Sequence, residues 1–212
     1  MKIGVLGSGP VGKELSKGLL KLRHEVMVGT RDQAKLADWA VEMGEKASVG
    51  SFSDAAKFGE IIFIATSWEG TESALKMAGP DNFREKIVVD VTNPLDTSHG
   101  APPRPAIQYP VSASEKIQKW LPGAKVVKAF NTVPAHVQVH PKQIGEADLF
   151  IAGDKEAKEF VKAIADEWGW HGVVDMGDLS AAYWIEMLAM LVINYGFKYN
   201  DWNFAIRFLR KK

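Results

Sequence analysis

The chain opens with an alternation of apolar patterns that predicts strand, helix and strand in turn. Lys2 to Leu6 is a short apolar segment of strand length, and Glu25 to Thr30 is a second one. Between them, apolar residues recur at the three- and four-residue spacing of a helix, namely Val11, Leu15, Leu19 and Leu22. Strand, helix and strand within about thirty residues form a βαβ unit, the half of a fold that binds one mononucleotide of a dinucleotide.

The same alternation continues along the chain. Further strands are predicted at Val49–Phe52, Glu60–Ala65, Lys86–Val91, Lys125–Phe130, Leu149–Ala152 and Gly172–Asp175. Helices are predicted at Ala34–Glu45, Ser53–Phe58 with Ser53 or Asp54 as its cap, Glu69–Ala78, Ser112–Leu121, Asp154–Trp168 and from Leu179 onward. Several strands lack polar alternation, as strands covered on both faces do. The sequence therefore predicts an α/β fold, a Rossmann-type doubly wound and mostly parallel sheet.

The last helix differs from the others because apolar residues occupy all of its sides. Trp184, Leu188 and Leu191 recur on one face, while Ile185 and Ile193 lie on the other. A helix of this kind is expected to be buried, either in the core or against a second subunit. We expect a small C-terminal α/β extension ending in this buried helix, with the tail packed on the body and Lys211 and Lys212 in water.

A glycine-rich turn follows the first strand, with the sequence Gly7-Ser8-Gly9-Pro10-Val11-Gly12. Gly7 permits the tight turn, Gly9 lets the backbone approach a pyrophosphate, and Gly12 lets helix and strand pack closely. Pro10 suits the first helical turn, where its missing N–H has no intrahelical partner. The alternative is a merely structural turn. In this strand-turn-helix context we interpret the motif as a dinucleotide site.

The end of the second strand bears on the choice of cofactor. An NAD site usually has an acidic residue here, which would repel the additional phosphate of NADP. This chain has Thr30 and Arg31, with Lys35 one turn further on, and a hydroxyl, a guanidinium and an ammonium suit a phosphate dianion. We therefore predict NADP. The alternatives are that these are surface charges, or that Asp32 holds the ribose of NAD.

Other polar clusters follow later strands, and the carboxyl ends of parallel strands share one edge of a sheet. Thr66 and Ser67, followed by Trp68, are predicted to lie against the cofactor phosphates or the nicotinamide ribose. Asn93 and Asn131 are predicted to hold the nicotinamide or the second substrate. The alternative for each single cluster is that it only ends a strand.

Composition narrows the class of protein further. The 212 residues carry 26 acidic and 26 basic side chains, so nothing favours nucleic acid or an anionic membrane as a partner. The chain has no cysteine, which excludes disulfides, thiol nucleophiles and cysteine-ligated metals. We expect no apolar run of membrane-spanning length and no signal peptide, and we predict a cytoplasmic protein.

Several segments together resemble a known family. They are the glycine turn, Thr30-Arg31, Ala65 to Glu69, Asp90 to Leu95, Lys128 to Ala135 and Gly177 to Ser180. They are similar to NADP oxidoreductases that depend on the deazaflavin coenzyme F420, a domain that also occurs in the cytosolic part of membrane ferric reductases. The resemblance covers nearly the whole chain, and Lys128 to Ala135 is its most specific piece.

The resemblance implies NADPH in the glycine crevice and a flavin-like ring stacked on the nicotinamide. That ring would contact the segment that contains Asn131, Val133 and Ala135. The resemblance also implies a homodimer. Residues 1–145 would form the NADP-binding Rossmann domain, and residues 146–212 would supply the acceptor side and the dimer contacts. The acceptor would be coenzyme F420 or a flavin such as FMN or FAD.

The expected chemistry needs few catalytic groups, because direct hydride transfer asks the protein mainly for proximity and orientation. Asn131 is the one candidate for orienting the reactants. Two alternatives stay open: an NADP-dependent imine or carbonyl reductase, which would need a proton donor such as His99, Tyr109 or His136, and a non-catalytic NADP-binding redox sensor. No metal site is predicted, although His136 and His140 stand four residues apart.

Overall fold

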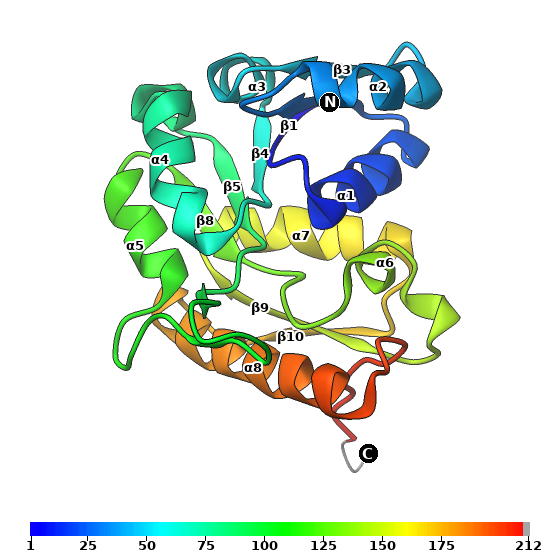
Figure 1. Ribbon diagram of the computed structural model, residues 1–212, viewed down its shortest axis with the longest axis vertical. Helices are drawn as coiled ribbons and strands as arrows, with labels where there is room; N and C mark the ends of the chain where they lie inside the picture. The colour runs from blue at the N-terminus through cyan, green and yellow to red at the C-terminus, as the bar shows by residue number, and fades with distance from the viewer. Residues whose placement is uncertain (210–212) are drawn as a thin grey trace.

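The computed structural model describes residues 1–209 and contains one sheet of eight strands (Figure 1). In chain order the strands are β1 (Lys2–Leu6), β2 (Glu25–Gly29), β3 (Ala47–Gly50), β4 (Ile61–Ile64), β5 (Ile87–Asp90), β8 (Lys125–Lys128), β9 (Asp148–Gly153) and β10 (Gly172–Asp175). Their order across the sheet is β10-β9-β8-β5-β4-β1-β2-β3. All neighbours are parallel except β8 and β9.

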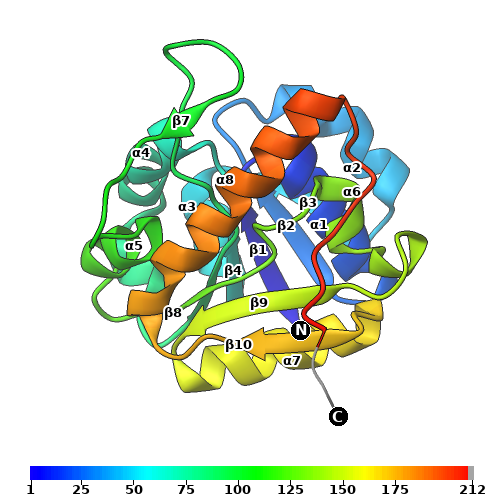
Figure 2. The same ribbon diagram turned by 90° about the horizontal axis from the view of Figure 1, so that it is seen from below.

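Eight α-helices accompany these strands in the described chain. They are α1 (Pro10–Lys21), α2 (Ala37–Met43), α3 (Phe52–Phe58), α4 (Trp68–Ala78), α5 (Ala113–Trp120), α6 (Ala135–Gln138), α7 (Lys155–Trp168) and α8 (Ala182–Tyr199). Short 3-10 turns lie at Ala34–Leu36, Pro80–Phe83, Pro141–Gln143 and Leu179–Ala181. The Pro-rich connection between β5 and α5 contains a small hairpin of β6 (Leu95–Asp96) and β7 (Arg104–Pro105) that projects from the body (Figure 2).

Two apolar clusters cover the two faces of the sheet. One cluster joins Val5 and Phe63 of the sheet to Leu15 of α1 and Val161 of α7. The other joins the alternate strand residues, such as Ile64, to side chains of α3, α4 and α5. Helices on both faces of a mostly parallel sheet make the fold doubly wound, which confirms the predicted Rossmann-type class.

The start of α3 differs from the sequence prediction. β3 ends at Gly50, and Ser51 rather than Ser53 or Asp54 caps the helix. The Ser51 hydroxyl accepts a hydrogen bond from the Asp54 amide at 3.1 Å, and the Asp54 carboxylate accepts one from the Ser51 amide at 2.9 Å. This reciprocal capping box starts the helix at Phe52, one residue before the expected Ser53.

The C-terminal part continues the same sheet. β9 runs antiparallel to β8, and α8 crosses obliquely over this end of the molecule (Figure 2). The described part of the tail packs on the body as expected, since the Asp148 amide donates to the Ile206 carbonyl at 2.9 Å. Lys211 and Lys212 lie outside the described residues. The division between 145 and 146 stays a prediction.

Within this chain the α8 helix is buried on one side only, so the core does not cover all of it, and burial of its other side against a second subunit stays a prediction. Ile185, Ala189 and Val192 are buried, whereas Trp184 is 57% exposed and Leu191 is 65% exposed. We also expected no apolar run of membrane-spanning length, and this expectation was wrong, because one helix has the length and the apolar composition of a membrane span. The segment Leu179–Tyr199 is long and apolar enough to cross a membrane, a test that the core helix of a soluble protein also passes.

Candidate functional site

The glycine turn joins β1 to α1 as a compact bend. Gly7 has a φ of +123°, which favours glycine, and a side chain at Gly12 would overlap the Gly7 carbonyl. Gly9 differs, because a Cβ atom there would meet nothing within 4 Å. The amides of Val11 and Gly12 lie in the first turn of α1, where no helical carbonyl precedes them as acceptor. Open space beside free N–H groups suits a pyrophosphate.

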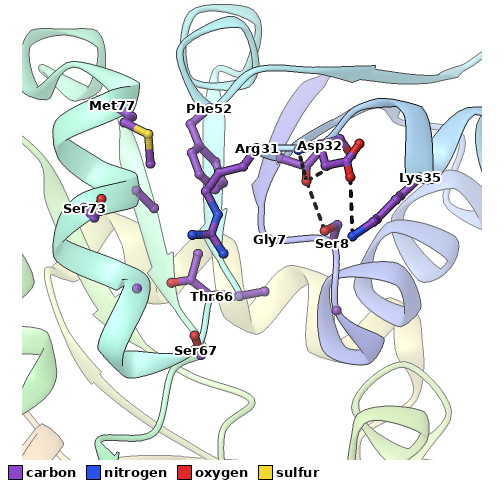
Figure 3. A pocket seen from close by; sticks show the side chains of 15 residues that line it. Gly7, Ser8, Arg31, Asp32, Lys35, Phe52, Thr66, Ser67, Ser73 and Met77 are labelled. Atoms are coloured by element: carbon purple, nitrogen blue, oxygen red, sulfur yellow. Dashed lines mark hydrogen bonds and ion pairs between the residues drawn. The ribbon is translucent and has the colours of Figure 1, made fainter.

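A first cavity of about 360 Å³ opens on one side of this turn (Figure 3). Its walls come from the ends of β1, β2 and β4 and from α4. The structure brings together here the predicted residues Gly7, Ser8, Gly9, Thr30, Arg31, Lys35, Thr66 and Ser67. These residues are far apart in the sequence, and the shared edge of the sheet explains their meeting.

The polar groups of this cavity favour an anion, because two cations, Arg31 and Lys35, outnumber the single carboxylate, Asp32. Arg31 points into the cavity on the side of Thr66 (Figure 3), and no carboxylate pairs with it among residues 1–209. Lys35 instead pairs with Asp32, with 3.4 Å between Nζ and Oδ2. The Thr30 hydroxyl lies 3.2 Å from that of Ser8. Arg31 is therefore the cation best placed to pair with a bound phosphate.

A second cavity lies beyond the start of α1. It collects the predicted residues Asn93, Asn131, Val133 and Ala135, and its other walls are Val11, Pro134, His136, Val192, Ile193 and Trp202. Gly9 lines the first cavity and Val11 lines the second. The two cavities thus flank the N-terminus of α1, and an elongated ligand held there by its phosphates would extend into both.

Trp68 is the predicted site residue that the structure places elsewhere. Its ring stacks on Trp120 of α5, with 5.8 Å between the ring centroids, and it lines neither cavity. Pro10 and Gly12 are absent from both linings as well and stand at the first and third positions of α1. Trp68 therefore serves packing between α4 and α5.

Asn93 and Asn131 form a reciprocal pair in the second cavity. The Asn93 amide donates to the Asn131 carbonyl, and the Asn131 amide donates to Asn93 Oδ1, both at 2.9 Å. Asn131 is only 4% exposed, and its Oδ1 has no hydrogen-bond partner among the described residues. A buried acceptor without a partner costs free energy, so this atom is suited to accept a hydrogen bond from a bound ligand.

Three buried charges lie directly behind this pair, and the sequence analysis did not identify them as a site. Lys128 at the end of β8 lies 2.7 Å from Asp90 and 3.1 Å from Glu186, and all three side chains are fully buried. The signal was present: Lys128 ends an apolar strand, and Glu186 is the one acidic residue in an apolar helix. We call these three residues the buried charge cluster.

Every polar atom of the buried charge cluster has partners. The third donor of Lys128 goes to the Thr92 carbonyl at 2.8 Å. Asp90 accepts from the Thr92 amide and hydroxyl and from the Ser114 hydroxyl. Glu186 accepts from the amides of Ala113 and Ser114 at the start of α5. The cluster therefore ties β5, β8, α5 and α8 together.

Burial and charge act against each other in this cluster. Burial raises the pKa of the Glu186 carboxyl, while the Lys128 charge and the Ala113 amide oppose the rise. Burial alone would lower the pKa of Lys128, but the charges of Asp90 and Glu186 outweigh it and the pKa is raised. Lys128 is thus held in its charged form.

The remaining candidate proton donors are dispersed. His99 and Tyr109 lie in the exposed hairpin region and line neither of the two cavities. His136 lines the second cavity, and its Nε2 lies 3.2 Å from Asn203 Oδ1. His140 contacts Lys21 on the outer side of α1. Of the candidates, His136 lines the cavity that holds Asn93 and Asn131, whereas His99 lines a separate cavity between the hairpin and α8.

Comparisons with known proteins agree with this arrangement. A family model described as NADP oxidoreductase coenzyme F420-dependent matches residues 2–94. The F420-dependent NADP reductase of Methanocaldococcus jannaschii is 30% identical over 98% of this chain and 97% of its own length. The crystal structure of a provisionally assigned F420-dependent NADP reductase from Arthrobacter sp. FB24 superposes with a TM-score of 0.94 at 37% identity, covering 99% and 100% of the two chains.

Other proteins resemble this chain over only part of their own length, or resemble it in fold alone. Rat metalloreductase STEAP3 is 31% identical over 91% of this chain, but the chain spans 37% of the length of that protein. A reductive aminase from Aspergillus terreus, solved with NADPH, superposes with a TM-score of 0.67 over 94% of this chain and 62% of its own, at 18% identity. At that identity the likeness shows the fold alone.

Replacing Lys128 with methionine should destabilise the protein strongly, because two buried carboxylates would lose their countercharge. We expect Lys128→Met to lower the free energy of unfolding by about 3–5 kcal/mol, measured by urea unfolding. The matched control is Lys125→Met in the same strand. Lys125 pairs with Glu156 at the surface, so its loss should cost less than about 1 kcal/mol. Equal effects of the two changes would contradict a stabilising role for the cluster.

Proposed function

Because the chain belongs to the family of F420-dependent NADP reductases and is an NADP-dependent oxidoreductase, we propose that it exchanges hydride between NADP(H) and a deazaflavin of the coenzyme F420 type. A flavin such as FMN or FAD is the second candidate acceptor. The observation that carries the proposal is the pair of cavities on either side of the α1 N-terminus, with an unpartnered Asn131 oxygen in the second.

The first cavity is proposed to hold the adenosine end of NADP. Arg31, Lys35 and Thr30 would bind the additional phosphate, since they combine two cations with a hydroxyl at the end of β2. The amides at the start of α1 would bind the pyrophosphate. Thr66 and Ser67 would contact the phosphates or the ribose from the opposite wall.

The second cavity is proposed to hold the nicotinamide and the acceptor ring. The free Oδ1 of Asn131 would accept a hydrogen bond from an amide of the bound ring system, which orients it. Val133, Val192 and Ile193 supply an apolar wall that excludes water from the reacting atoms. When bound, the nicotinamide supplies the hydride, so this chain needs no acid or base of its own for the transfer.

Arg31 is expected to distinguish NADPH from NADH. Arg31→Ala should weaken NADPH binding by about 1.5–3 kcal/mol, the range for a lost hydrogen bond to a charged group, and leave NADH binding nearly unchanged. Calorimetric titration of both cofactors measures the difference. Arg84→Ala is the control, because Arg84 lines neither cavity. An equal loss for NADPH and NADH would refute the assignment of the phosphate site.

The acceptor can be identified by anaerobic mixing of the protein with NADPH and, separately, coenzyme F420, FMN and FAD. We expect the absorbance of NADPH to decay with at least one of them. Asn131→Leu should slow that decay by up to about a hundredfold, because a misplaced ring reacts slowly even when it binds.

Two other results would favour the alternatives. Tight NADPH binding with no oxidation by any acceptor would indicate a redox sensor. Turnover of imines or carbonyl compounds that is lost in His136→Ala would indicate the reductase alternative, since His136 is the candidate proton donor that lines the second cavity.

We also propose that the protein acts as a homodimer. The exposed side of α8 carries the apolar residues Trp184, Leu191 and Tyr195, which are 57%, 65% and 44% exposed. This apolar stripe adjoins Val192 and Ile193, which line the second cavity. A second copy of the chain would cover the stripe and stand beside the acceptor. The cytoplasmic location expected from the sequence stays a prediction.

Introducing a charge into this stripe should separate the subunits. Leu191→Glu is expected to be monomeric in analytical ultracentrifugation at micromolar concentrations, where the unaltered protein is dimeric, because the carboxylate would be buried without a partner. Val41→Glu is the matched control, since Val41 is also apolar and 83% exposed but lies on α2. A monomeric unaltered protein would contradict the proposal.

A further inference from the structure

The buried charge cluster carries a net charge that its own contacts do not balance. It combines two carboxylates, Asp90 and Glu186, with one ammonium group, Lys128. All three side chains have no exposed surface, so solvent ions do not screen them as they screen surface charges. Buried ionic groups in proteins are usually paired, and here one negative charge is left over.

The hydrogen bonds around the two carboxyls favour their charged form and act against the effect of burial. The oxygens of Asp90 meet the Thr92 amide and hydroxyl, the Ser114 hydroxyl and the Lys128 ammonium. Those of Glu186 meet two backbone amides and the same ammonium. Every one of the four carboxyl oxygens thus faces at least one group that can only donate, either a backbone amide or the Lys128 ammonium, and such groups favour the charged form. The net charge is therefore close to minus one.

The N-terminus of α5 offsets a part of this charge. Its first amides, those of Ala113 and Ser114, donate to Glu186, and a helix N-terminus is equivalent to roughly half a positive charge. The offset is incomplete. Neutralising one carboxylate would still change the local charge by a full unit.

The cluster lies immediately behind the second cavity. Asp90 precedes Asn93 by three residues, and Lys128 precedes Asn131 by three, a span of at most about 11 Å of chain. On α8, the carbonyl of Ile185, the neighbour of Glu186, lies 3.5 Å from the Asn131 amide nitrogen. A charge at this distance acts on whatever ring Asn93 and Asn131 hold.

We propose that the net negative charge of Asp90, Lys128 and Glu186 stabilises the oxidised, positively charged nicotinamide and thereby favours hydride transfer from NADPH to the acceptor. The inference rests on the proposed function for the place of the nicotinamide. In the transfer one hydrogen leaves with two electrons, and the neutral ring becomes a cation. The acceptor gains that hydrogen and both electrons, and it takes up a proton from water.

The expected size of the effect follows from Coulomb's law. A unit charge about 10 Å away, at an effective dielectric constant of about 20, changes an equilibrium by roughly tenfold. Phosphates, riboses and adenine are identical in NADP⁺ and NADPH. The ratio of the two dissociation constants therefore isolates the effect on the ring charge, and a general loosening of the site would leave that ratio unchanged.

The test compares NADP⁺ and NADPH binding in Glu186→Gln and in Asp90→Asn, by calorimetric titration without any acceptor. Each change removes one negative charge and keeps an oxygen acceptor in place. We expect the ratio Kd(NADP⁺)/Kd(NADPH) to rise about threefold to tenfold in both variants. Thermal unfolding confirms that each variant is folded, and either folded variant alone decides the question.

Glu115→Gln is the matched control, because it removes a carboxylate from the first turn of the same helix, α5, outside the cluster. Its ratio should stay within twofold of the unaltered protein. An unchanged ratio in a folded Glu186→Gln or Asp90→Asn variant overturns the proposal, and so does an equal loss of affinity for both cofactor forms. The measurement involves no acceptor, so a failure to reduce coenzyme F420 would count against the proposed function and not against this inference.

Discussion

The ion pairs of Lys128 with Asp90 and Glu186 are the interaction on which the rest of the structure depends. Taking three charges out of water costs several kcal/mol for each of them, and only complete pairing makes the burial tolerable. Here the pairing requires β5, β8, α5 and α8 to be in place at once, because each contributes a charge or a donor. An apolar helix such as α8 could slide along an apolar surface, whereas Glu186 fixes its position. The wall of the second cavity is fixed with it.

The N-terminus of α1 divides the site into two parts with different construction. The first cavity is built from strand ends and α4, and its polar groups include exposed cations on a turn. The second is built from buried amides and an apolar helix face, and the buried charge cluster supports it from behind. Flexible cations suit a solvated phosphate, while a reacting ring needs fixed neighbours. The difference in construction therefore matches the tasks proposed for the two cavities.

The local features of this fold could be predicted from the sequence, and the non-local ones could not. The run Ile61–Ile64 is apolar without alternation, so a strand covered on both faces follows directly. Gly7 to Gly12, Arg31 and Asn131 could be proposed as site residues from the sequence because glycine turns and strand ends are recognisable in short segments. Trp68 was misplaced because its partner, Trp120, is 52 residues away in a helix whose position the sequence does not fix. The role of Glu186 was also missed, because its partner Lys128 is distant in the sequence. Without that partner, the pattern assigns an acidic residue to the surface.

The backbone conformation of Phe130 determines where the next residue, Asn131, lies in the second cavity. Phe130 has a φ of +61°, a left-handed conformation that costs a residue with a side chain roughly 1–3 kcal/mol. Its buried ring packs between Phe63 and Trp168, and its carbonyl accepts a hydrogen bond from Gln138 at 2.9 Å. These contacts hold a conformation that the residue alone would avoid. The chain consequently turns sharply after β8, and Asn131 is brought against Asn93 instead of continuing along the strand. The left-handed turn at Phe130 thus places the unpartnered Oδ1 of Asn131 at the wall of the second cavity.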